Sequence, residues 1–163
     1  MKIFNLNYNK FKIKRDKMNN KEEAIEYLEN AKISHLEWVE KAKDLVFSNL
    51  DLSEKIIPVN STECKFGKWF FNEGRELLLL EEISDLTEIE SLHKELHEIY
   101  EIIFNIYYLK NKKSFIGNLF GIKRKIDSED LNKSKKSFNK MVLVSEKLLK
   151  EIEVINQILI KIS

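Results

Sequence analysis

Two rows of apolar residues with helical spacing constrain this chain most, because each row includes a histidine. The first row runs through Ile25, Leu28, Ala31, His35, Val39, Ala42 and Val46, and the second through Leu86, Ile89, His93, Leu96, Tyr100, Ile103 and Tyr107. Steps of three and four residues place each row on one face of a helix. A buried imidazole without a hydrogen bond or a metal ion is costly. The pattern therefore predicts packed helices whose interior histidines need partners.

The composition favours long helices. The 163 residues include only four glycines and one proline, and Lys, Glu, Leu and Ile are abundant. A third apolar row from Phe138 to Leu159 contains no candidate metal ligand and predicts a packing helix. We predict an all-α fold, an antiparallel four-helix bundle over residues 19–163 with one short extra helix that carries Cys64.

Capping patterns predict where these helices begin. Asn20 with Glu23 and Thr87 with Glu90 have the spacing of a capping box. Asp127 or Ser128 can start the last helix, and Ser61 or Thr62 can cap the short helix that includes Cys64. In the first turn of that helix, the helix dipole and the unpaired amides would favour the Cys64 thiolate.

The histidines and the cysteine together indicate a metal site. His93 and His97 are four residues apart, so both rings project from one helix face and can bind one ion. The chain has three histidines and one cysteine, and a helical bundle could bring all four together. The alternatives are a core His35 bonded to a backbone carbonyl and an inert buried thiol at Cys64.

In chain order, the motifs His35-x-x-Trp38, Cys64-x-Phe-Gly67-x-Trp69 and His93-x-x-x-His97 resemble the bacterial chemoreceptor zinc-binding domain. The resemblance covers about residues 20 to 160. It implies a helical bundle with one zinc ion per chain, and related domains form homodimers. It also implies that these domains regulate a chemoreceptor or a diguanylate cyclase. The zinc ligands it implies are His35, Cys64, His93 and His97, and the packing positions are Trp38, Gly67 and Trp69.

The four predicted zinc ligands indicate what kind of function the site can have. Three imidazoles and one thiolate make a closed tetrahedral zinc site, which does not activate water. We therefore expect no enzyme activity, since a hydrolase would need an open coordination position and a base such as Glu90, Glu95 or Glu98. Our hypothesis is a regulatory module of bacterial signal transduction, of chemotaxis or cyclic-di-GMP type, which senses zinc or oxidants such as hypochlorous acid through the redox-sensitive Cys64.

The alternative is a zinc-stabilised scaffold, a homodimeric helical bundle without a sensing role. Zinc storage is disfavoured because one site per chain gives little capacity. A di-iron carrier is disfavoured because the chain lacks the inward carboxylate motifs of that class. These 163 residues contain no output region, so we expect the module to act on a separate signalling protein.

Charge and hydropathy exclude other classes. The 28 Lys and Arg residues balance 27 Asp and Glu residues, so nothing global indicates nucleic-acid binding. Without a signal peptide or an apolar span, we expect a cytoplasmic protein and no membrane-surface role.

Two segments are predicted to lie outside the helices of the bundle. We interpret residues 1–18 as a basic, frayed or strand-like extension, and the alternative is an arm that binds nucleic acid or a membrane. Residues 110–127 are predicted to form an inserted loop, for docking or for packing against the bundle.

Overall fold

The computed structural model describes residues 2–48, 58–109 and 126–162, with side chains from residue 21 onward. Its described elements are all helical. They are α1 (Lys2–Lys43), the π-helix η1 (Asp44–Ser48), α2 (Lys65–Phe70), the 3-10 helix η3 (Glu73–Leu79), α3 (Thr87–Phe104), the π-helix η4 (Asn105–Leu109) and α6 (Ser128–Lys161). The predicted all-α fold is confirmed.

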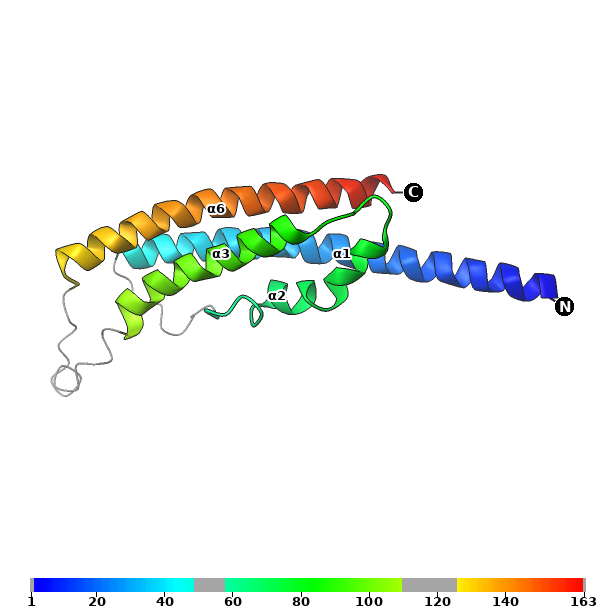
Figure 1. The fold of residues 1–163 in the computed structure, drawn as a ribbon, viewed down its shortest axis with the longest axis horizontal. Helices are drawn as coiled ribbons and strands as arrows, with labels where there is room; N and C mark the ends of the chain where they lie inside the picture. The colour runs from blue at the N-terminus through cyan, green and yellow to red at the C-terminus, as the bar shows by residue number, and fades with distance from the viewer. Residues whose placement is uncertain (1, 49–57, 110–125, 163) are drawn as a thin grey trace.

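The three long helices α1, α3 and α6 lie side by side and do not all run in the same direction (Figure 1). α1 and α3 point the same way, α6 runs antiparallel to both, and the chain returns between α1 and α3 through α2 and η3. The predicted antiparallel bundle is therefore present. The short helix that follows Cys64 is the second member of the bundle within the described residues, where we had expected an addition to four longer helices.

Two predicted features of the first helix and its N-terminal extension differ from the structure. α1 is continuous from Lys2, so the predicted start at Asn20 is wrong, and so is the frayed or strand-like form of the preceding extension. In Figure 1 the N-terminal part of α1 continues past the end of α6. Residues from Met18 to Glu23 contain neither proline nor glycine, so nothing interrupts the helix there. The predicted loop at 110–127 lies outside the described residues, except for its last two positions.

Predicted capping is right at α6 and wrong at α2 and α3, as it is at α1. The Asp127 side chain accepts a hydrogen bond from the Asp130 amide at the start of α6, as expected. Cys64 is itself the N-cap of α2, in place of Ser61 or Thr62. α3 begins at Thr87, but the Thr87 hydroxyl and amide both donate to Asp85, and so Thr87 forms no capping box.

Polar contacts fix the register between α1 and α6. The Lys32 ammonium lies 2.5 Å from the Glu153 carboxylate, and the buried Asn156 amide donates to Glu29. Near the opposite end of α6, the Phe47 and Phe138 rings pack edge to face at 5.4 Å. As residue numbers rise along α1 and η1, the numbers of the residues that they contact on α6 fall. A one-turn slip would break every one of these pairs.

The core is densest between α3 and α6. Apolar side chains on both helices are completely buried there, namely Leu96, Ile103, Met141, Leu148, Ile152 and Leu159.

None of the described helices combines the length and the hydropathy that crossing a bilayer requires.

Replacing Leu148 with alanine should lower the free energy of unfolding by about 2 to 5 kcal/mol, because a fully buried leucine leaves a cavity when it is truncated. Ile160→Ala is the matched control, since Ile160 lies on the same helix with 55% of its surface exposed. Its expected effect is within about 0.5 kcal/mol. Equal effects of the two variants in urea unfolding would show that this packing is wrong.

Candidate metal centre

Cys64 is positioned by the turn that precedes α2. As the N-cap, its sulfur accepts a hydrogen bond from the Gly67 amide at 3.2 Å. A Cβ atom at Gly67 would lie 1.8 Å from the Ser61 carbonyl oxygen, so only glycine allows this turn to close. The turn brings the half-buried Cys64 side chain to face α3.

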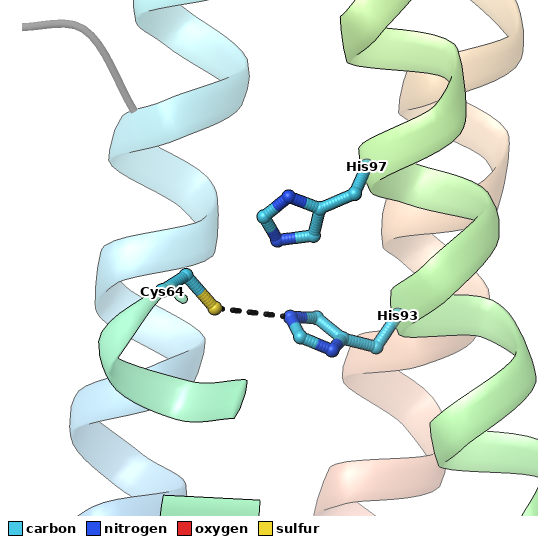
Figure 2. A group of neighbouring side chains, drawn as sticks. All are labelled: Cys64, His93 and His97. Carbon is cyan, nitrogen blue, oxygen red and sulfur yellow. Dashed lines mark hydrogen bonds between the residues drawn. The ribbon is translucent and has the colours of Figure 1, made fainter. Parts of the chain in front are cut away.

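His93 and His97 lie one turn apart on α3 and point toward Cys64 (Figure 2). The Cys64 sulfur is 3.2 Å from Nε2 of His93. One donor atom from each of the three residues falls within 4.8 Å of the other two. In a tetrahedral zinc site the donor atoms are separated by roughly 3.3 to 3.6 Å, as bond lengths of about 2.0 to 2.3 Å require. The three donor atoms would therefore have to move only slightly closer together to bind one zinc ion.

The imidazole hydrogen bonds leave ring nitrogens free for a metal. Nδ1 of His97 is 3.0 Å from the Val59 carbonyl, and Nδ1 of His35 is 2.7 Å from the Ala31 carbonyl. Bonds of this kind orient a histidine whose Nε2 is the metal ligand. Nε2 of His97 is buried and has no hydrogen-bond partner among the described residues. An unpaired buried nitrogen beside a thiol is what a bound metal ion would satisfy.

His35 lies beside the cluster but is not part of the group of three. Its ring centroid is 5.7 Å from that of His93, and its ring is buried in the α1 interface. The Phe66 ring contacts both histidines edge to face, at 5.5 Å from His35 and 4.9 Å from His93. The role of His35 as the fourth zinc ligand, which the sequence predicts, stays a prediction. It requires the His35 ring to move closer to the donor atoms of Cys64, His93 and His97.

Burial keeps the histidines neutral. Burial, with a smaller contribution from the neighbouring histidines, lowers the pKa of His93 to about 3. Burial also lowers the pKa of His97 to about 4, although the hydrogen bond to the Val59 carbonyl opposes that shift. Burial also lowers the pKa of His35, against the opposing hydrogen bond to Ala31. All three rings are therefore in the neutral form that metal binding requires at pH 7.

The structure corrects the expectation that Cys64 is held as a thiolate. Burial raises the pKa of the Cys64 thiol, and this outweighs the amides of Gly67 and Phe66 and the charge of Lys68, which lower it. The dipole of a six-residue helix is too weak to reverse that balance. Without metal, Cys64 is thus a thiol at neutral pH.

The predicted packing residues lie around the cluster. Trp38 is buried, with its ring centroid 4.6 Å from that of His97 and 6.0 Å from that of His35, so it covers His97 more closely than it covers His35. Trp69 stacks in parallel on Tyr27 at 5.2 Å, which attaches α2 to α1. Sequence reasoning missed Tyr27 as well as the Val59 carbonyl. A backbone carbonyl leaves no signal in side-chain patterns, and Tyr27 lies outside the apolar row.

Comparison with known families agrees with this geometry. The family model of the chemoreceptor zinc-binding domain matches residues 35–103. Residues 35–103 therefore belong to the chemoreceptor zinc-binding domain family. The matched stretch begins at His35 and includes Cys64, His93 and His97, whereas α6 lies outside it. No curated protein and no solved structure matches the chain.

The family and the cluster together establish zinc as the bound metal and the chain as a zinc-binding signalling module. A set of one thiolate and neutral imidazoles suits zinc, since these are its preferred soft and borderline donors. When bound, zinc would be held by Cys64, His93 and His97, with His35 as the predicted fourth ligand. It would supply a fixed positive charge that keeps Cys64 deprotonated.

Zinc binding near neutral pH should release one proton per ion, and that proton should come from Cys64. The histidines are already neutral, whereas the thiol must deprotonate. Between about pH 5 and pH 8, the association constant should therefore rise about tenfold per pH unit. Isothermal titration calorimetry in buffers of different ionisation enthalpy measures both quantities.

The matched control for this prediction is Cys64→Ala, whose weaker binding should release no proton and depend little on pH over the same range. A release of two or more protons by the wild-type protein at pH 6 would contradict the prediction, because it would mean that the histidines are protonated in the metal-free protein.

Proposed function

We propose that this chain is a zinc-dependent regulatory module in which the state of the metal site controls the position of α2. The observation that carries the proposal is the unequal anchoring of the ligands. Cys64 precedes a helix of six residues, whereas His93 and His97 lie in the middle of the long, buried α3. A helix this short is not stable by itself, so its position depends on its contacts. Loss of the Cys64 contact would free the N-terminal end of α2, whose other anchors are the buried Trp69 and Phe70 rings, and leave the long helices in place.

Oxidation of Cys64 is a second way to change the position of α2. A zinc-bound thiolate can react with hypochlorous acid to give a sulfenic acid and chloride, so that sulfur loses two electrons and the oxidant is reduced. A sulfenic acid is a poorer ligand than a thiolate, so the reaction weakens one metal bond. We propose that zinc occupancy and oxidation of Cys64 both act through α2 on a separate signalling protein, a chemoreceptor or a diguanylate cyclase.

A zinc-stabilised scaffold is the second candidate, and one observation favours it. The site joins the turn before α2 to α3 twice, through Cys64 and His93 and through Val59 and His97. Both histidines are also almost completely buried. A metal in such a position can supply a large share of the folding free energy. The two candidates differ in how much of the chain unfolds when zinc leaves.

Cys64→Ala should weaken zinc binding by more than the roughly 10- to 100-fold that removal of an outer-shell partner costs, because it removes a ligand. Treatment of the wild-type protein with one equivalent of hypochlorous acid should have a similar effect. The helical content of α1, α3 and α6 should survive both changes. Zinc content, far-ultraviolet circular dichroism and tryptophan fluorescence, to which both Trp38 and Trp69 contribute, measure these outcomes in the same samples.

Lys65→Ala is the control, since Lys65 is an exposed residue of α2 outside the cluster. Melting of the whole chain on zinc loss would establish the scaffold and reject the sensor. Wild-type protein purified without zinc and unable to bind it would reject both candidates.

We propose further that two copies of the chain associate through oppositely charged faces of α1 and α6. Along the exposed face of α6, lysines and two apolar residues recur at heptad spacing, namely Lys133, Lys136, Lys140, Leu143, Lys147, Lys150 and Val154. The exposed face of α1, continued by η1, carries acidic and apolar residues with the same spacing, namely Glu26, Ile33, Glu37, Glu40, Asp44 and Phe47, and Asn30 lies in the same row. Heptad stripes of opposite charge are suited to pairing between helices.

Charge reversal tests this dimer. Lys136→Glu with Lys147→Glu, or Glu26→Lys with Glu37→Lys, should each yield monomers in sedimentation equilibrium at low salt, because like charges would then face each other. An equimolar mixture of the two double variants should restore a dimer. Lys94→Glu, an exposed position on α3, is the control. A dimer that survives either double reversal, or a wild-type monomer, would refute this interface.

A further inference from the structure

Arg75 connects the Cys64 helix to the histidine helix without involving the metal. It lies in η3, just after α2, and its guanidinium nitrogen Nη2 is 2.5 Å from the Glu90 carboxylate. Glu90 is in the first turn of α3, three residues before His93. The ion pair therefore joins the segment that follows Cys64 to the segment that precedes the histidine pair.

The same guanidinium also covers two aromatic rings at the end of α2. Its central carbon is 5.2 Å from the centroid of Phe70 and 5.5 Å from that of Phe71. Phe70 is completely buried, so these contacts attach Arg75 to a fixed part of the short helix. A planar guanidinium can stack on rings and pair with a carboxylate at once, which an ammonium group does less well.

We propose that Arg75 is a positioning residue for the zinc site, which holds α2 against α3 so that Cys64 meets His93 before zinc binds. The contacts of Arg75 lie at the C-terminal end of α2, and Cys64 lies at its N-terminal end, so the two fix both ends of the helix on α3. Without Arg75, zinc binding would first have to order α2. The cost of that ordering would appear as lower affinity.

Solvent exposure of the ion pair limits how much Arg75 can contribute to zinc affinity. The Arg75 and Glu90 side chains are each 38% exposed, so the ion pair alone contributes little, and the aromatic contacts add to it. Arg75→Gln should therefore weaken zinc binding by about 3- to 30-fold. Arg75→Lys should recover part of the loss, because it keeps the charge but not the planar stacking. Lys65→Gln, which removes a charge from exposed α2 surface, should have no effect.

A double-mutant cycle separates positioning from general stabilisation. Because Arg75 acts through Cys64, Arg75→Gln should not change the residual zinc affinity in a Cys64→Ala background. In the otherwise wild-type chain, Co²⁺ bound to Arg75→Gln should also show a weaker thiolate-to-metal charge-transfer band. Titrations with zinc and with Co²⁺ alone measure both quantities.

The outcomes distinguish this inference from the proposals above. An equal loss of affinity in the wild-type and Cys64→Ala backgrounds would overturn it, because Arg75 would then stabilise the bundle without acting on Cys64. Unchanged affinity in Arg75→Gln would overturn it too, while leaving the zinc site and the sensor proposal intact. Failure of the wild-type protein to bind zinc would instead overturn the site on which both depend.

Discussion

The burial of imidazole rings between α1 and α3 is the constraint on which the rest of this structure depends. Each of His35, His93 and His97 is at most 4% exposed, and each carries two ring nitrogens into an apolar interior. Two of the rings satisfy Nδ1 with a backbone carbonyl, and the thiol of Cys64 lies against the third. Among the described residues, Nε2 of His97 and Nδ1 of His93 have no hydrogen-bond partner. A zinc ion held by Cys64 and the Nε2 atoms would satisfy His97, and so the core of the bundle and its metal site are the same region.

The site also explains the otherwise unusual sequence of the turn before α2. Gly67 is required by the Ser61 carbonyl, and the Gly67 amide in turn binds the Cys64 sulfur. Phe66, two residues after the cysteine, places its ring against His35 and His93. Within four residues the chain provides a ligand, a hydrogen bond to that ligand and an apolar cover for its neighbours. The short helix is thus organised around its N-cap, Cys64.

Helical spacing made much of this arrangement predictable from the sequence. The rows through His35 and His93 identified the buried faces of α1 and α3, and the interval between His93 and His97 placed two rings on one face. Helix boundaries were less predictable, because capping residues also take part in other contacts. Glu90 pairs with Arg75 and Thr87 with Asp85, so the apparent capping box is occupied by tertiary and turn interactions. The protonation of Cys64 could not be predicted either, since burial and not helix position determines it.

The carbonyl of Val59 has a consequence for how quickly the site can exchange its ion. It belongs to the segment before Cys64, and it orients His97 through Nδ1. Detachment of this segment would remove the thiol and free the His97 ring to rotate in the same event. Local opening of a short segment is far more frequent than global unfolding. We therefore expect the lifetime of the bound ion to follow the opening rate of residues 59–70, while the long helices remain folded through many exchanges.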